Sequence, residues 1–239
     1  YMASAAKYNE ERGAELIDIN MGCPAKKVLK KAAGSALLSN EKLVEDILQS
    51  VVKSVSVPVT LKYRTGPTPN KRNGVRIAKI AEANGISGLA VHGRTRECKF
   101  QGCAEYATIT KIVGAVGIPV LANGDIDSPE KAMEVMSRTG AAGVMLGRSV
   151  LGQPWLCGQI DQYIKRNGLY GVAKRIIFKK GDSHQLLLDM CSSDDFDYYN
   201  YPAFSPSSQW VQNNFKKGRR GFCNESFYGD ENVFRVTWL

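Results

Sequence analysis

Short apolar runs that each end in a cluster of polar residues recur along the first two thirds of the chain. The first run lies at residues 16–19 and stops abruptly at Asn20, Gly22, Cys23 and Pro24. Uninterrupted Ile and Leu are typical of strands that are buried on both faces of a parallel sheet. Gly22 permits a tight turn and Pro24 prevents the strand from continuing, so Cys23 is expected at the carboxyl end of a strand.

Four further strands and five helices follow from the same kind of pattern. Strands are predicted at residues 58–64, 88–91, 118–122 and 143–146. Helices are predicted up to Gly13, at 40–55, 74–84 and 104–116, and from the capping residue Ser128 to about Gly140. This alternation predicts an α/β fold with a parallel sheet and helical crossovers.

Every polar cluster falls directly after a predicted strand. The clusters are residues 20–27, 62–66, 92–96, 123–125 and 147–148. The carboxyl ends of parallel strands share one edge, which is where α/β proteins bind their ligands. We therefore expect one active-site mouth built from five loops.

Five strands do not close a barrel, whereas eight do. We expect a TIM (β/α)8-type barrel with about five of its eight units present and three strands missing before residue 1. The strands at 118–122 and 143–146 then become the seventh and eighth, whose loops often bind phosphate in such barrels. The residues that suit this role are Asn123, Gly124, Asp125, Gly147 and Arg148. Each short pair could also be merely a turn.

Composition narrows the class of protein. Hydrophobic residues make up 44% of the chain and charged residues 23%, as in a soluble globular protein, and no apolar run is long enough to cross a membrane. The six cysteines show no CxxC spacing, which argues against a zinc or iron–sulfur site and favours a reducing cytosol. We expect a cytoplasmic protein without a bound metal.

The net charge of +9 is concentrated in the first part of the chain. Residues 1–166 carry 23 Lys and Arg against 15 Asp and Glu, while residues 167–239 carry 9 against 8. Such an excess suits a surface that meets a polyanion, although ordinary solubility explains charge equally well. Four lysines that follow Cys23 would favour its thiolate, unless the cysteine is structural and the lysines form a solvated helix face: Lys26, Lys27, Lys30 and Lys31.

The chain changes character at about residue 167. Residues 167–239 hold 14 of the 21 aromatic residues and show no clear helical or strand period. We predict a partial barrel over residues 1–166 and a C-terminal segment of unclear fold over 167–239. That segment is a small appended domain, a poorly ordered tail, or sequence foreign to the fold.

Five motifs in order resemble the tRNA-dihydrouridine synthase family, most closely its bacterial B-type branch. They lie at residues 17–28, 58–66, 91–96, 122–126 and 147–149, and the resemblance spans about residues 5–165. It implies a barrel that binds FMN and reduces a uridine of tRNA to 5,6-dihydrouridine, with NADPH as the reductant. It also implies an N-terminally incomplete chain, because the family's first strands have no counterpart here, and residues after about 166 do not resemble its C-terminal helical domain.

The resemblance assigns roles to individual residues. Cys23 matches the catalytic cysteine, which gives a proton to C5 of the uracil while FMN delivers hydride to C6. Lys62 and His92 match residues at the flavin, and the phosphate-binding residues named above match the loops that hold the FMN phosphate. Asn20 and Arg64 match positions near the substrate uracil, and Lys26 and Lys27 are expected to contact tRNA.

A basic rim around the mouth is expected to grip the backbone of the folded RNA, and we expect a monomer. Beyond Lys26, Lys27, Lys30 and Lys31, the rim includes Lys71, Arg72, Arg94, Arg96 and Lys99. Two alternatives stay open. One is another FMN-barrel pyrimidine reductase, similar to dihydroorotate dehydrogenase; the other is a non-catalytic RNA-binding fragment.

Overall fold

The structure is a computed structural model that describes residues 1–25, 28, 32–167 and 236–238. Six strands within these residues form one sheet in the order β5-β4-β3-β2-β1-β6, and every neighbouring pair is parallel. The strands are β1 (Leu16–Met21), β2 (Val59–Arg64), β3 (Gly88–His92), β4 (Val120–Asn123), β5 (Gly143–Met145) and β6 (Val236–Trp238). The first five confirm the predicted strands, and β6 was not predicted.

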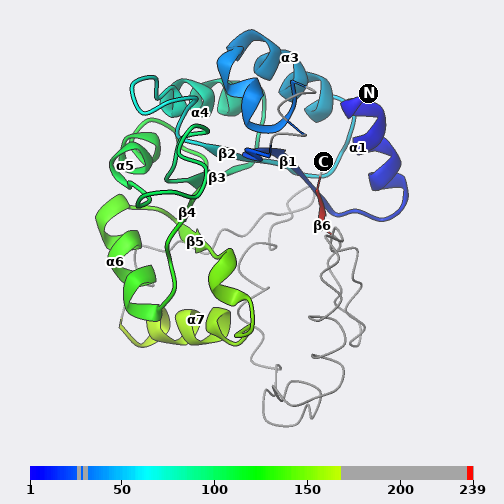
Figure 1. The fold of residues 1–239 in the computed structure, drawn as a ribbon. Coiled ribbons are helices and arrows are strands. Elements are labelled where there is room, and N and C mark those ends of the chain that lie inside the picture. Colours follow the sequence, from blue (N-terminus) through cyan, green and yellow to red (C-terminus); the bar gives the residue numbers. More distant parts are fainter. Residues whose placement is uncertain (26–27, 29–31, 168–235, 239) are drawn as a thin grey trace.

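Helices connect the strands and cover one face of the sheet. They are α1 (Met2–Glu11), α3 (Glu41–Val52), α4 (Gly74–Ala83), α5 (Ala107–Val113), α6 (Pro129–Thr139) and α7 (Leu156–Arg166). Two short 3-10 helices are η1 (Gly34–Ser39) and η2 (Arg148–Val150). Figure 1 shows α3 to α6 in an arc around the outside of the strands. The predicted order of alternating strands and helices is confirmed.

Local signals in the sequence account for the ends of the predicted helices. Ser128 caps α6, since its side chain accepts a hydrogen bond from the backbone N–H of Lys131. Gly140 ends the same helix in the left-handed conformation with φ of 70°. Asn40 caps α3 by accepting a hydrogen bond from the N–H of Leu43.

Alternate residues along the strands face two different environments. On the helix side, strand residues join helix residues in one hydrophobic core, including Ile17, Ile19, Leu61, Val91, Val44, Leu48, Ile77 and Ile109. The neighbouring positions point to the opposite face, because side chains alternate along a strand. This inner face carries a polar row made of Asp18, Asn20, Thr60, Lys62, Arg64, His92 and Asn123.

The structure departs from the sequence prediction at two helices and at one strand. α5 is shorter than the predicted 104–116, because residues 104–106 pack against the loop after β3: the N–H of Glu105 donates to the carbonyl of Gly93 at 2.7 Å. α7 was not predicted, and it packs against α6 with Leu156 and Ile160 buried. β6 pairs with β1 from Leu16 to Asp18, so β1 is flanked on both sides.

Among the described residues, no helix has the length and apolar character that a membrane crossing requires. Apart from residue 167 and β6, the C-terminal segment predicted at 167–239 lies outside the described residues.

Candidate active site at the carboxyl ends of the strands

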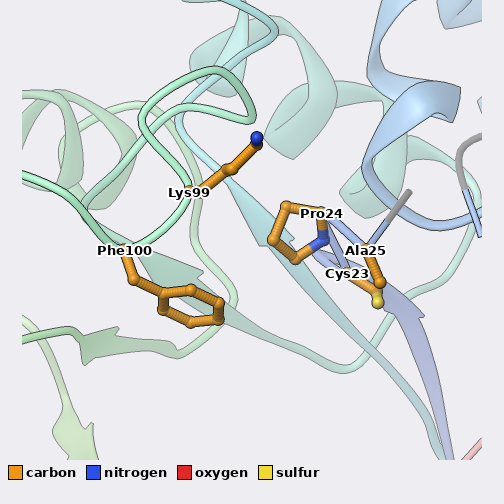
Figure 2. Close-up of a pocket in the computed structure, with 5 residues that line it drawn as sticks. All are labelled: Cys23, Pro24, Ala25, Lys99 and Phe100. Carbon is orange, nitrogen blue, oxygen red and sulfur yellow. The ribbon is translucent and has the colours of Figure 1, made fainter.

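Cys23 lies in the loop after β1, as predicted, and opens onto a surface hollow of about 320 Å³. Cys23, Pro24 and Ala25 line one part of this hollow, and Lys99 and Phe100 from the loop after β3 line the rest (Figure 2). The backbone of Cys23 is held in place, because its carbonyl accepts hydrogen bonds from both the N–H and the hydroxyl of Ser35. The thiol is therefore presented to the hollow from a fixed loop.

Gly34 allows this loop to approach so closely. It has a φ of +59°, and a Cβ at this position would lie 2.8 Å from the carbonyl oxygen of Cys23 and 2.9 Å from Val28. Any larger residue would push the chain away from Cys23. The small apolar stretch between the cysteine loop and α3 thus serves to fix the cysteine.

Lys62 extends from β2 toward the same loop. It stands opposite Asn20 in the sheet, and its Nζ is 3.7 Å from where a Cβ on Gly22 would be. Burial is the largest influence on the pKa of Lys62 and lowers it; the charge of Asp18 raises this pKa, and the charge of Arg64 lowers it. Cys23 and Lys62 therefore share one end of the sheet, and no described residue forms a hydrogen bond or ion pair with this ammonium.

Asp18 lies deeper on the same face and is only 5% exposed. Its Oδ1 accepts a hydrogen bond from the hydroxyl of Thr60 at 2.6 Å. Burial raises the pKa of Asp18 to about 6, against the opposing effects of Thr60 and of the charge on Lys62. A buried carboxylate thus stands below a half-buried ammonium.

Arg64 joins two loops of the mouth. It is 2% exposed, and its guanidinium donates to the carbonyls of Gly22 at 2.7 Å, Thr95 at 3.1 Å and Lys99 at 2.7 Å. Burial, followed by the charge of Arg94, lowers the pKa of Arg64 to about 10, so it remains charged at neutral pH. These contacts place Arg64 under the hollow as a support for its walls.

His92 ends β3 beside these cations. Burial is the largest cause that lowers its pKa, to about 3, and the positive charges of Arg64, Lys62 and Arg94 add to the effect. The imidazole is consequently neutral at physiological pH. Its Nε2 lies 3.4 Å from a guanidinium nitrogen of Arg94, which suits an accepting nitrogen at that position.

Hydrogen bonds to neighbouring segments hold the loop after β4 in place. The side chain of Asn123 donates to the carbonyl of Met145 at 2.7 Å, and the carbonyl of Gly124 accepts from the hydroxyl of Tyr106 at 2.7 Å. Gly124 has a φ of +115°, and a Cβ there would lie 3.0 Å from the Cβ of Ala104. Both the backbone conformation and the lack of space therefore require a glycine at this turn.

Asp125 connects this loop to its neighbours. Its Oδ2 accepts from Arg94 at 2.7 Å and from the N–H of Ala104 at 2.7 Å, and Oδ1 lies 3.8 Å from Arg148. Partial burial would raise the pKa of Asp125, but these hydrogen bonds and the charges of Arg94 and Arg148 lower it overall. The carboxylate therefore orients the two arginines.

The loop after β5 is open by comparison. A Cβ at Gly147 would meet nothing within 4 Å, and the side chain of Arg148 is 65% exposed. The Oγ of Ser149 is buried and has no hydrogen-bond partner among the described residues. Space, a cation and an unused hydroxyl are the features that an anionic group requires, so these residues fit a phosphate.

The predicted substrate residues occupy different settings. Asn20 is exposed at the end of β1, and its Oδ1 accepts a hydrogen bond from the N–H of Gly22. Arg64 is buried and engaged with carbonyls, and Lys26 and Lys27 lie outside the described residues.

The predicted basic rim is only partly described. Lys71, Arg72 and Lys99 are exposed, and Arg96 is half-buried. Arg94 is 4% exposed and bonded to Asp125 and to the carbonyls of Gln101 and Gly102, so its expected place on the rim is wrong. Lys30 and Lys31 lie outside the described residues.

Phe100 and Asp18 were absent from the predicted site. Phe100 is 54% exposed in the hollow, with the guanidinium carbons of Arg64 and Arg148 at 5.5 Å and 5.3 Å from its ring centre. An exposed aromatic residue in a loop after a strand was a usable signal. An Asp inside an apolar run was another, since charged residues are rarely buried without a partner.

Comparison with known proteins places the chain in a family. Residues 1–199 match the family described as dihydrouridine synthase (Dus), and the chain belongs to it. The five β/α units are thus part of a TIM-type barrel, which confirms the predicted fold class.

Particular relatives define the branch. The chain is 61% identical to tRNA-dihydrouridine synthase B of Shewanella oneidensis over 164 residues, which are 69% of this chain and 51% of that protein. It is also 61% identical to tRNA-dihydrouridine synthase B of Pseudomonas syringae pv. tomato, over 68% of this chain and 48% of that protein. The B-type resemblance is confirmed, and the chain spans about half the length of the curated relatives it matches.

A solved structure of phosphonopyruvate hydrolase in complex with oxalate and Mg²⁺ shares 16% identity at a TM-score of 0.48, covering 67% of this chain and 59% of that chain.

Proposed function

We propose that this chain carries the flavin and uracil sites of a cytoplasmic tRNA-dihydrouridine synthase, which reduces a uridine of tRNA to 5,6-dihydrouridine. The observation that carries the proposal is the convergence of Cys23 and Lys62 at one end of the sheet, beside a hollow. The curated relatives named tRNA-dihydrouridine synthase B support the same activity.

FMN is the cofactor that these residues would hold. Gly147, Arg148 and Ser149 offer space, positive charge and a hydroxyl to its phosphate, with Arg148 oriented by Asp125. Lys62 offers an ammonium to the pyrimidine end of the flavin, where a cation stabilises the negative charge of the reduced form. When bound, FMN would supply the hydride for C6 of the uracil, and NADPH would reduce it again.

Cys23 serves as the acid in this proposal. A base must leave the stack to enter a pocket, and the hollow beside Cys23 is the described space that opens to the surface there. The thiol gives its proton to C5, which together with hydride at C6 saturates the C5–C6 bond. Asn20 is exposed beside the cysteine loop and is available to hydrogen-bond the uracil edge.

His92 and Arg64 have supporting roles here. The neutral imidazole of His92 lies next to Arg94 and below the loop after β4, where it can accept or donate one hydrogen bond without adding charge. Arg64 holds the carbonyls of Gly22 and Lys99, which keeps the walls of the hollow in place.

The tRNA backbone would meet exposed cations in the loops after β2 and β3, which include Lys71, Arg72 and Lys99. The roles proposed for Lys26 and Lys27 in tRNA contact, the monomeric state and the absence of a metal stay predictions.

Two measurements on the purified chain test the proposal. The chain is expected to bind FMN with a change in the visible flavin spectrum, and to form dihydrouridine in unmodified tRNA when NADPH is supplied. Flavin binding with reduction of a free pyrimidine instead of tRNA would favour the dihydroorotate dehydrogenase-like alternative. Binding of tRNA without binding of FMN would favour the non-catalytic alternative.

A further inference from the structure

The side chain of Asp18 has an unused oxygen in the interior of the sheet. Oδ1 accepts from Thr60 at 2.6 Å, but the buried Oδ2 has no hydrogen-bond partner among the described residues. A buried carboxylate with an unpaired oxygen is costly, so a compensating charge is expected nearby.

Lys62 carries an opposite charge on the same face of the sheet, without a direct ion pair to Asp18. Asp18 pairs with Thr60 in the register of β1 and β2, and Lys62 lies two residues beyond Thr60 on the same face. The two charges act on each other: Lys62 lowers the pKa of Asp18, and Asp18 raises the pKa of Lys62. The other described groups that act on Lys62 are Arg64, two residues further along β2, and Cys23.

The inner face therefore carries charge in layers. An anion at the level of Asp18 lies below the ammonium of Lys62, and the cation of Arg64 lies above it with neutral His92 as its strand partner. Burial and Arg64 both favour loss of the proton from Lys62, and Asp18 is the deeper group that opposes this loss.

We infer that Asp18 is a supporting residue whose charge, on the same face of the sheet, keeps Lys62 protonated, with Thr60 holding the carboxylate in place. The benefit to a flavin pocket rests on the proposed function, whereas the pairing itself does not.

The test is a pH titration of Lys62 by NMR, on the full chain labelled with ¹³C and ¹⁵N in lysine, with the Lys62 signal assigned by its loss in Lys62→Arg. Asp18→Asn keeps the shape of the side chain and removes its charge. We expect the titration midpoint of Lys62 to move to lower pH by roughly one pH unit, the size typical of losing an adjacent opposite charge. An unchanged midpoint would overturn the inference.

Glu15→Gln is the matched control. Glu15 is exposed just before β1, so this variant makes the same change of charge three residues away without touching the inner face. The midpoint of Lys62 is expected to stay in place. A shift equal to that of Asp18→Asn would show a general charge effect and would contradict a specific pairing.

The unmodified chain provides a second test that holds even where Asp18→Asn fails to fold. The Lys62 signal is expected to show a small additional inflection near pH 6, where Asp18 titrates. His92 titrates far below this point, with its pKa near 3, so it does not produce the same inflection. A single transition without this inflection would overturn the inference.

The result separates the two proposals. If the titration of Lys62 depends on the charge of Asp18 but the chain binds no FMN, the proposed function is refuted and the inference about Asp18 stands. If instead the chain binds FMN and reduces tRNA, but the Lys62 signal does not change with the charge of Asp18, the proposed function stands and the inference about Asp18 is refuted.

Discussion

Two arginines face the same phenylalanine from different regions of the mouth. Arg64 is buried between the loops after β1 and β3 and donates to three carbonyls, whereas Arg148 is exposed after β5 and makes one loose ion pair with Asp125. Their guanidinium carbons lie at similar distances from the ring of Phe100. The same side chain thus supports the protein's own backbone in one region and is available to a ligand in the other.

This contrast indicates that the two regions have different roles. Hydrogen bonds within the protein hold the loops around Cys23 and Arg64 in place, which suits groups that must be oriented for chemistry. The region of Gly147 and Arg148 has open space and few contacts, which suits a part that closes around a bound group. Variants in each region should therefore change different properties.

The largest effect is expected for Cys23→Ala. Loss of the acid should lower the rate of dihydrouridine formation by about 100-fold or more, the usual contribution of a positioned acid. Flavin absorbance should be unchanged, because the phosphate loops are untouched. The measurement is dihydrouridine content of tRNA after timed incubation, alongside the visible spectrum; Cys103→Ala, at an exposed cysteine of the loop after β3, is the control. Activity retained in Cys23→Ala would contradict the assigned acid.

The next largest effect is a difference in protein stability between variants of the two arginines. Arg64→Met leaves the carbonyls of Gly22, Thr95 and Lys99 without their donor, and should lower the free energy of unfolding by about 3 kcal/mol. Arg148→Met is the matched control and should change it by less than about 0.5 kcal/mol. Urea unfolding followed by circular dichroism measures both. Equal losses in the two variants would remove the distinction between the regions.

For cofactor affinity, Arg148 is expected to matter more than Arg64. Arg148→Met should weaken FMN binding by roughly tenfold, as expected for one charge-assisted contact to phosphate. Titration followed by quenching of flavin fluorescence gives the dissociation constant. Lys165→Met, in the last turn of α7, is the control. A dissociation constant unaffected by Arg148→Met would place the phosphate elsewhere.

The last prediction concerns how stability depends on pH through His92. Its pKa is lowered from 6.5 to about 3 in the folded protein, so the unfolded chain binds the extra proton first as pH falls. Stability from this group is full above pH 6.5 and is lost as pH falls toward 3, by at most about 1.4 kcal/mol for each pH unit. Asp18 acts in the opposite sense between its ordinary pKa of 3.8 and about 6.

Comparison with His92→Gln isolates the histidine. Urea unfolding at several pH values should show a shallower loss of stability in acid for the variant than for the unmodified chain. Identical pH profiles would mean that His92 is not buried beside the arginines as described.

The order of the first five strands and of the helices between them was determined by the sequence alone. Apolar runs such as residues 16–19 and 118–122 require burial on both faces, and Ser128 and Gly140 mark the ends of a helix through local hydrogen bonds and backbone conformation. Because parallel strands end at one edge, the sequence also determined that Cys23, Lys62, His92 and Asn123 share that edge.

Tertiary structure alone decided what each of those side chains contacts. Nothing in the order of residues distinguishes Arg64 from Arg148, or Arg94 from an exposed rim cation, because burial depends on which loops fold over a strand end. The placement of Asp18 and Lys62 on the same face depends likewise on the register of β1 against β2. Local sequence specifies the elements through short-range forces, whereas charge partners and burial come from residues far apart in the chain that meet only in the folded sheet.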